Sequence, residues 1–293
     1  MILNQLYDYI GSKNVLQKKY ISIAKDALND KEREKFKEII NYFLKSRTLE
    51  EIGDAYLLFV EDTLEETKYF VEHGKYRYST LNEVCSSVYF NDEYMTKYML
   101  GLIVSGYIWF NHLAIHRYYT KQIRKFSGEH FLEIGPGHGE YFEEALNYQQ
   151  FNDYLGVDLS PSSVEAAQKY ITNFSKYKNY HIACLDFMQF QEREKYDGIA
   201  MSEVLEHVEF PERMLNKIYG LLKSEGKAYI TTVVNAPTKD HIYLFHTIEE
   251  VLDLVKKTGF IIDDYFCVAA NNVSIEKAID KKRAINIAIV LSK

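Results

Sequence analysis

The stretch Phe131-Leu-Glu-Ile-Gly-Pro-Gly-His-Gly-Glu140 decides how the rest of the chain is interpreted. A short apolar run is followed by glycine at three alternate positions and then by a segment with helical spacing. Glycine lets the backbone turn tightly and approach a ligand, and the first turn of the next helix offers free N–H groups. The pattern predicts a strand, a cofactor-binding turn and a helix, with a tight turn that binds no ligand as the alternative.

The spacing of these glycines argues against a dinucleotide. In the dinucleotide fingerprint G-x-G-x-x-G a third glycine follows two variable residues, and Glu140 stands at that position here. A carboxylate there would repel a pyrophosphate. Glu133, at the end of the predicted strand, suits a cofactor that carries an amine instead.

Composition limits the classes of protein to which the chain can belong. With 293 residues, 47% hydrophobic and 26% charged, it is long enough for one large domain or one domain with an extension. A net charge of −7, with dispersed lysines, disfavours nucleic acid as a partner. Three scattered cysteines and a start without a leader-like pattern lead us to expect a cytoplasmic protein. The most apolar stretch, Met99–Phe110, is shorter than the roughly 20 residues that cross a bilayer, so we expect a core helix and no membrane partner.

Residues 1–125 show helical spacing and almost no strand signal. A capping box at Thr48-Leu-Glu-Glu51 opens one helix, and a longer helix is predicted over residues 91–125. Small residues leave a notch in that longer helix, where another helix or a ligand could approach: Gly101, Ser105 and Gly106.

From residue 126 strands and helices alternate. Strands are predicted at about 130–134, 154–158, 180–185, 196–201, 227–234, 260–268 and 284–291. Seven strands with intervening helices indicate an α/β fold with an open, mostly parallel sheet covered on both faces. We therefore predict two domains, 1–125 and 126–293, packed directly against each other.

Acidic residues follow successive predicted strands. In an open parallel sheet, ligands bind beyond the carboxyl ends of the strands. Asp158 ends the second strand, about 20 residues beyond the glycine turn, where a carboxylate can accept from both ribose hydroxyls. Asp186 offers an acceptor for an adenine amine, and Phe187 offers an aromatic face. Each acid alone is more often a solvated or capping residue, but together they indicate an adenosine site.

These motifs resemble those of the class I S-adenosylmethionine-dependent methyltransferases. The resemblance covers residues 128–293 and rests on Leu132-Glu-Ile-Gly-Pro-Gly-His-Gly139, Gly156-Val-Asp158, Leu185-Asp186-Phe187 and Ser202-Glu-Val-Leu-Glu-His-Val208. It implies a Rossmann-like seven-stranded sheet with an antiparallel last strand, and an N-terminal helical region that caps the pocket and recognises the acceptor. It also implies that these residues bind S-adenosylmethionine: Glu133, Gly135, Pro136, Gly137, His138, Gly139, Asp158, Leu159, Asp186, Phe187 and Ser202.

The stretch Glu203-Val-Leu-Glu206-His207 bears on mechanism. On a helical turn positions i, i+3 and i+4 share a face, so two carboxylates and an imidazole would converge and could hold a divalent cation. The stretch is similar to the E-x-x-E-H motif of ubiquinone-pathway O-methyltransferases and small-RNA 2′-O-methyltransferases. In the RNA enzymes a further histidine follows the fifth strand, and His241 matches that position better than His246. The resemblance implies Mg²⁺, Mn²⁺ or Zn²⁺ at Glu203, Glu206, His207 and His241.

The chemistry at this stretch has two interpretations. A cation would lower the pKa of an acceptor hydroxyl, with Glu206, His207 and His241 as the catalytic residues. An E-H pair also occurs in methyltransferases that need no metal, and His207 could then act as a general base. The pair His112 and His116 has metal-like spacing but lacks an acid nearby in sequence, which favours a packed pair on a helix.

We expect an enzyme that methylates a hydroxyl of a small molecule. The alternatives are N- or C-methylation of a small molecule or peptide, 2′-O-methylation of RNA, a nicotinamide-dependent oxidoreductase, and a cofactor-binding module without turnover. A homodimer is compatible with the sequence, which does not determine the oligomeric state.

Overall fold

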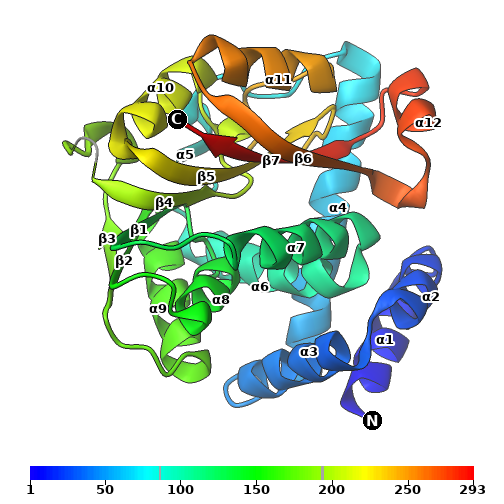
Figure 1. The fold of residues 1–293 in the computed structure, drawn as a ribbon. Coiled ribbons are helices and arrows are strands. Elements are labelled where there is room, and N and C mark those ends of the chain that lie inside the picture. The colour runs from blue at the N-terminus through cyan, green and yellow to red at the C-terminus, as the bar shows by residue number, and fades with distance from the viewer. Residues whose placement is uncertain (86, 193–194) are drawn as a thin grey trace.

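The structure is a computed structural model that describes residues 1–85, 87–192 and 195–293. Over these residues the second half of the chain forms one seven-stranded sheet, against which the helical first half packs (Figure 1). The strand order is β3-β2-β1-β4-β5-β7-β6, with β7 antiparallel to both neighbours and the other pairs parallel. The strands are β1 (His130–Ile134), β2 (Asp153–Asp158), β3 (Tyr180–Cys184), β4 (Tyr196–Met201), β5 (Leu222–Val234), β6 (Ile261–Ala269) and β7 (Ile285–Ser292). The predicted α/β fold is confirmed.

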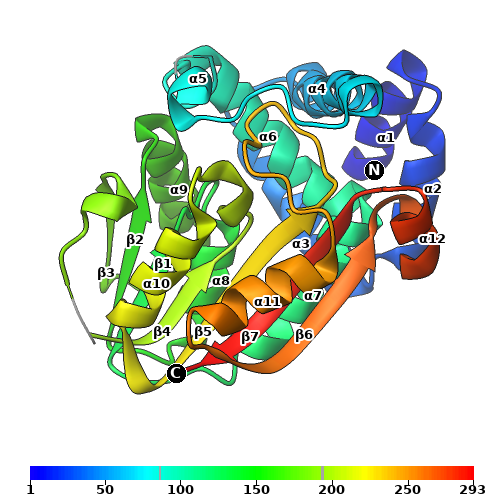
Figure 2. The same ribbon diagram turned by 90° about the horizontal axis from the view of Figure 1, so that it is seen from above.

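Helices cover both faces of the sheet (Figure 2). Alternate residues of a strand point to opposite faces, so Phe131 packs among α7, α8 and α9, whereas its neighbour Leu132 packs in the other core, with α10 and α11. These helices are α7 (Phe110–Ile123), α8 (Glu140–Tyr148), α9 (Pro161–Phe174), α10 (Pro211–Leu221) and α11 (Ile248–Lys257), and α12 (Ile275–Asp280) lies between β6 and β7 in the chain.

The first half contains α1 (Ile2–Lys13), α2 (Gln17–Ala27), α3 (Asp30–Phe43), α4 (Leu49–His73), α5 (Leu81–Cys85) and α6 (Asp92–Ile108). The predicted capping box is present at the start of α4, where the Thr48 side chain accepts from Glu51 N–H and the Glu51 carboxylate accepts from Thr48 N–H. Gly74 ends α4 in the left-handed conformation, with φ of 69°.

The prediction of one continuous helix over residues 91–125 is wrong. Trp109 is extended, with φ −91° and ψ 121°, and α6 and α7 meet there at an 84° bend. The Trp109 indole N–H donates to the Tyr56 hydroxyl at 2.9 Å, and its ring lies 5.0 Å from that of Phe59. Packing of this side chain on α4 stabilises the break, and the bend brings α7 onto the sheet.

The stretch Met99–Phe110 belongs mostly to α6, which is buried along much of its length, as expected of a core helix. Within the described residues no single helix has the length and apolar character needed to span a membrane. Helices α6 and α7 have the length and apolar composition of a membrane span only when they are taken together, and they are bent by 84° relative to each other.

The small-residue notch in α6 accommodates a neighbouring helix. A Cβ atom added at Gly101 would lie 2.4 Å from the backbone oxygen of Ala55 in α4, so this glycine permits close helix packing. A Cβ atom at Gly106 would meet nothing within 4 Å, and Gly106 faces a cavity instead.

We expect Gly101→Ala to lower the free energy of unfolding by about 2 kcal/mol, because a clash with fixed backbone outweighs the gain in helix propensity. Gly106→Ala is the matched control in the same helix. It should raise stability by up to about 1 kcal/mol, since it adds propensity without a clash. Urea denaturation of both variants measures the difference, and equal stabilities would contradict the packing argument.

Candidate functional site

A cavity of about 1300 Å³ lies at the carboxyl ends of the parallel strands. Its floor consists of the segments that follow β1, β2, β3 and β4, and residues of α4, α6 and α7 also line it. Helices α4, α5 and α6 lie beyond the strand ends (Figure 2). The cavity is therefore where the fold predicts a ligand.

The glycine turn adopts the conformation that its sequence predicts. Gly135, Gly137 and Gly139 have φ of 68°, 55° and 89°. Gly137 N–H donates to the Asp158 carboxylate at 3.1 Å, and a Cβ atom on Gly137 would meet no atom closer than the sulfur of Met99, at 3.7 Å. Gly137 is thus open to the cavity.

Gly139 has a different position from the other two glycines and does not line the cavity. A Cβ atom there would lie 2.8 Å from Cα of Ala167 in α9, so Gly139 permits close packing of α8 on α9. Two other predicted residues of the turn, Pro136 and His138, do line the cavity.

Glu133 lies at the end of β1 and is only 2% exposed. Its Oε2 has no hydrogen-bond partner among the described residues, and burial raises the pKa of this carboxyl group. An unsatisfied buried oxygen is costly, at about 1–3 kcal/mol. Because Glu133 lines the cavity, a ligand with a donor group would satisfy it.

Asp158 lies at the end of β2 with its carboxylate beside the glycine turn. In addition to Gly137 N–H, it accepts from Ser160 N–H at 2.9 Å, and burial raises its pKa to about 6 despite these bonds. Each oxygen keeps a free lone pair that a ligand hydroxyl can use. Leu159 follows it and also lines the cavity.

Asp186 and Phe187 border the cavity beyond β3. Asp186 caps a short 3-10 helix, η1 (Phe187–Gln189), by accepting from Met188 N–H at 2.8 Å. Phe187 is 6% exposed and packs mainly in the core under α10. Ser202, after β4, lines the cavity with a buried hydroxyl that has no partner among the described residues.

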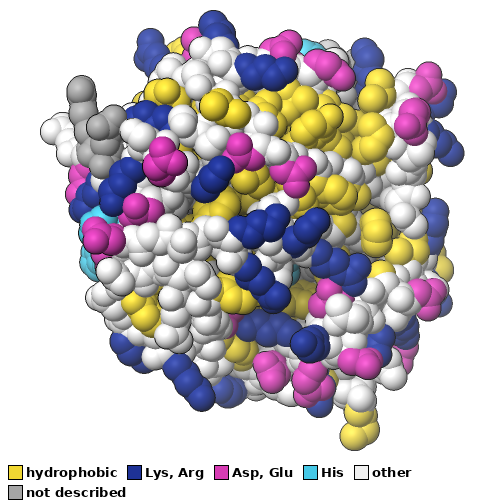
Figure 3. Space-filling view, in the orientation of Figure 1, with side chains coloured by type: hydrophobic (Ala, Val, Ile, Leu, Met, Phe, Trp, Pro, Cys, Tyr) yellow, Lys and Arg dark blue, Asp and Glu magenta, His cyan; other side chains and the backbone are white. Residues whose placement is uncertain are grey.

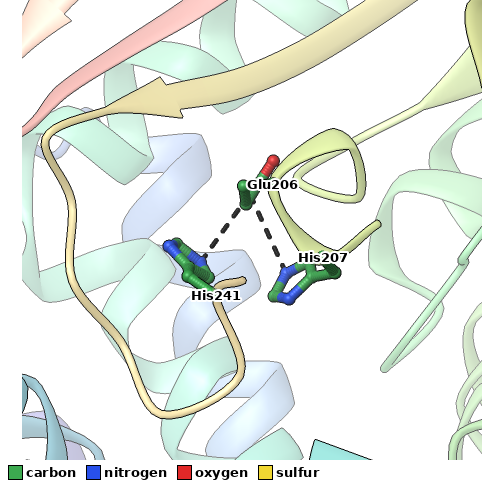
Figure 4. Close-up of side chains that lie close together, drawn as sticks. All are labelled: Glu206, His207 and His241. Carbon is green, nitrogen blue, oxygen red and sulfur yellow. Dashed lines mark ion pairs between the residues drawn. The ribbon is translucent and has the colours of Figure 1, made fainter. Parts of the chain in front are cut away.

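The structure brings Glu206, His207 and His241 together (Figure 4). Glu206 Oε1 lies 3.8 Å from Nε2 of His207 and 3.8 Å from Nε2 of His241. Glu206 and His207 belong to the 3-10 helix η2 (Leu205–His207), and His241 comes from the segment between β5 and α11. The sequence stretch and the distant histidine thus form one cluster.

Hydrogen bonds determine which ring nitrogen of each histidine is free. His207 Nδ1–H donates to the Asp240 carbonyl at 2.9 Å, and His241 Nδ1–H donates to the Ala236 carbonyl at 2.6 Å. Both Nε2 atoms therefore face Glu206 and carry a lone pair there when the ring is neutral. The other oxygen of Glu206 accepts from Thr232 at 2.7 Å, while its Oε1 has no hydrogen-bond partner in the described structure.

Burial and charge alter the ionisation of this cluster. Burial, with His207 next to it, lowers the pKa of His241 to about 3, so His241 is neutral at pH 7. Burial also disfavours the charged form of His207, but the Asp240 and Glu206 carboxylates raise its pKa overall. Burial raises the pKa of Glu206.

Glu203 does not join this cluster, because the stretch is not one continuous helical turn. Glu203 has φ of 53°, and its carboxylate accepts from the Asn286 side chain at 3.1 Å. Its other oxygen is buried without a partner among the described residues, and burial beside Glu206 raises its pKa to about 8. Asn111 of α7 in turn donates to Asn286 at 2.8 Å.

The helical half contacts the segment that carries His241. The Tyr76 hydroxyl accepts from Ala236 N–H at 3.1 Å, and the Tyr76 ring lies 5.9 Å from that of His241. Tyr98 of α6 donates to Asp240 at 3.4 Å. These contacts were missed by sequence reasoning, because no local pattern relates residues about 140 or more positions apart.

The other histidines lie apart from the cluster. His116 pairs with Glu144 at 2.7 Å, and although burial opposes the charge, this carboxylate raises the pKa of His116 to about 9. His112 contacts the Ser105 hydroxyl at 2.9 Å, and burial lowers its pKa to about 4. His246 is exposed.

The outer face of α7 carries a group of basic side chains (Figure 3). These side chains are exposed: Arg117, Lys121, Arg124 and Lys125. The charge of Arg117 is compensated by Glu32 at 2.6 Å, and Arg124 lies over the Tyr148 ring. This basic group is on the outer surface, whereas the opposite side of α7 lines the cavity.

Residues 111–260, slightly more than half of the chain, match the methyltransferase domain family. The chain is 28% identical over 139 residues to a ubiquinone biosynthesis O-methyltransferase of Coxiella burnetii, which covers 47% of this chain and 58% of the relative. It is 29% identical over 138 residues to a mitochondrial ubiquinone biosynthesis O-methyltransferase of Candida albicans, which covers 46% of this chain and 41% of the relative. The chain thus spans about half the length of the curated relatives it matches.

The fold is similar to that of Haemonchus contortus phosphoethanolamine N-methyltransferase 2, solved with S-adenosyl-L-methionine. The TM-score is 0.54 at 17% sequence identity, over 74% of this chain and 60% of that chain. This likeness concerns the fold alone. With the sheet order and the match over half of its length, the chain belongs to the methyltransferase domain family, among the class I S-adenosylmethionine-dependent methyltransferases.

Proposed function

We propose that this protein transfers a methyl group from S-adenosylmethionine to a hydroxyl oxygen of a small molecule. The observation that carries the proposal is the position of Glu206, His207 and His241, which form one cluster beside the cavity that the glycine turn and Asp158 line. A cavity between the strand ends and the helical half suits a small acceptor better than RNA, since the basic group on α7 lies on the outer surface.

The cavity floor fits S-adenosylmethionine. Asp158 has free lone pairs for ribose hydroxyls, Gly137 leaves space for close approach, and the unsatisfied Glu133 Oε2 suits the amine of the methionine part. Asp186 and Phe187 border the space for adenine, and Leu159, Ser202, Gly135, Pro136 and His138 line the same floor. The cofactor supplies the methyl group on a sulfonium, which needs little activation.

The cluster also fits a divalent cation. Two imidazole nitrogens and one carboxylate oxygen face one another, and metal bonds of about 2.1 Å would set such atoms about 3.0–3.4 Å apart. The observed 3.8 Å separations are slightly wider. Backbone carbonyls hold both rings through Nδ1, as carbonyls commonly do at metal sites. A bound Mg²⁺, Mn²⁺ or Zn²⁺ would lower the pKa of an acceptor hydroxyl.

The chain's own residues have defined parts in this proposal. Glu206 and the two imidazoles provide negative charge and lone pairs on one side of the acceptor hydroxyl. Asp240 and Ala236 orient the imidazoles through their carbonyl groups. We further propose that residues 1–125 form a cap that excludes water and recognises the acceptor, and that residues 126–293 form the cofactor-binding domain.

Asp158→Ala should weaken the binding of S-adenosylmethionine by about 1–3 kcal/mol, because buried ribose hydroxyls lose their acceptor. In the wild type, affinity should fall as the pH drops through about 6, where the carboxylate gains a proton. The matched control is Asp153→Ala, at the opposite end of β2 and partly exposed. Calorimetry measures both, and an unchanged affinity for the Asp158 variant would remove it from the site.

Glu206→Gln should reduce the affinity for Mn²⁺ or Zn²⁺ by about 10–100-fold and lower turnover, with cofactor binding retained. His246→Ala, an exposed histidine on the same segment, should change neither. Metal titration and methylation of catechol with labelled cofactor, before and after chelation, provide the measurements. Full activity after chelation would argue for the metal-free interpretation, with His207 as a general base.

Tyr76→Phe should weaken metal binding several-fold and leave cofactor affinity unchanged, because Ala236 loses the hydroxyl that holds its N–H near His241. Tyr78→Phe, on the same segment, is the control, because the Tyr78 hydroxyl has no hydrogen-bond partner among the residues that the structure describes. Metal titration with a melting curve separates this effect from general destabilisation. Equal metal affinities in the two variants would show that the helical half does not position His241.

A further inference from the structure

The cavity extends beyond the strand ends into the helical half. At 1300 Å³ it exceeds the roughly 300–1,000 Å³ of common small-molecule sites. Part of its lining comes from α2, α4 and the segment around α12. Figure 2 shows α2 and α12 at the end of the molecule opposite α9, and a hydrogen bond from Tyr20 to Asn271 connects α2 to the segment between β6 and α12.

One wall of this extension is an apolar stripe on α4. Its residues lie at helical spacing along one face and line the cavity: Val60, Thr63, Leu64, Thr67 and Val71. The hydroxyls of Thr63 and Thr67 donate to carbonyls of their own helix, at 2.8 and 2.7 Å, which leaves their methyl groups to face outward. Leu64 and Val71 are 45% and 79% exposed. An apolar ligand would cover them.

Charge is separated along the cavity. The acidic residues that line it lie at the carboxyl ends of the strands or in the segments that follow them: Glu133, Glu140, Asp158, Asp186, Glu203, Glu209 and Asp240. The lining residues around α2 and α12 include four cations and no acid: Lys19, Lys277, Lys281 and Arg283. One more lining cation, Arg213, lies near the strand ends, over the Phe210 ring.

Three of the four cations have no acidic partner among the described residues. Lys281 pairs with Asp280 at 3.0 Å, whereas no ion pair is recorded for Lys19, Lys277 or Arg283. The other nearby acid, Glu276, lies in the first turn of α12 and does not line the cavity. In a protein with a net charge of −7, these cations form a local concentration of positive charge that would attract an anion.

We propose that the acceptor is an elongated amphiphile with an anionic group. The carboxylate or phosphate of such a molecule binds near Lys19, Lys277 and Arg283. Its apolar part lies along the α4 stripe, and its hydroxyl reaches the cluster of Glu206, His207 and His241. This inference rests on the proposed methyl transfer for the position of the hydroxyl, whereas the anion site and the stripe stand on the cavity lining.

The test is a binding experiment on the full chain saturated with S-adenosylhomocysteine. Dodecanoate, dodecyl phosphate, dodecanol and dodecyltrimethylammonium compete with a fluorescent dansyl fatty acid. We expect the two anions to bind about tenfold more tightly than dodecanol, because several exposed charges each contribute a fraction of a kcal/mol. The tighter of the two anions identifies the preferred group.

Two variants and a control test whether the tighter binding of the anions depends on the lining cations and on the α4 stripe. Lys19→Gln, Lys277→Gln and Arg283→Gln combined should remove the advantage of the anions and leave dodecanol binding unchanged. Lys18→Gln with Lys282→Gln removes two neighbouring charges that do not line the cavity and should preserve that advantage. Leu64→Asp should weaken all four ligands.

Equal affinity for dodecanol and the anions, preference for the trimethylammonium compound, or no binding at all would overturn the proposal. Calorimetry with S-adenosylmethionine tests the proposed methyl transfer separately. A chain that binds the cofactor but none of the amphiphiles retains its proposed function and loses this substrate class.

Discussion

The parallel pairing of β1 with β2 and β4 is the constraint on which the site depends. Ile134 pairs with Val157 on one side and with Met201 on the other. The residues that follow these three positions, Gly135, Asp158 and Ser202, therefore leave the sheet at one level. Backbone hydrogen bonds impose this register, so residues about 20 to 70 positions apart line one cavity floor.

Buried polar atoms without partners concentrate around that floor. Glu133, Ser202, Glu203 and Glu206 each keep a buried oxygen unsatisfied among the described residues. An unsatisfied buried group lowers stability, which a fold tolerates where a ligand completes the hydrogen bonds. The cluster of Glu206, His207 and His241 has this character, since Glu206 Oε1 and the two Nε2 atoms face one another at 3.8 Å without a hydrogen bond. These unsatisfied oxygens thus lower the free energy of unfolding, and they lie at the site where we expect a ligand to bind.

The geometry of the candidate site depends on contacts between the helical half and the sheet. The break at Trp109 turns α7 onto the sheet and leaves α6 beyond the strand ends. Tyr76 and Tyr98 then contact the segment that carries His241. The helices that we propose to recognise the acceptor and the segment that carries His241 are consequently parts of one packed unit. A change in the helices can alter the chemistry without touching the cofactor.

The sequence by itself determined the sheet, the glycine turn and the acids after the strands, because strand alternation, positive φ and capping are local properties. The grouping of Glu206 and His207 also followed from their proximity in the chain. The family resemblance also indicated His241, but only the tertiary structure decided that Glu203 turns toward Asn286 and that the long helix breaks at Trp109. Each of these depends on contacts between distant segments, whose packing energies outweigh local propensity.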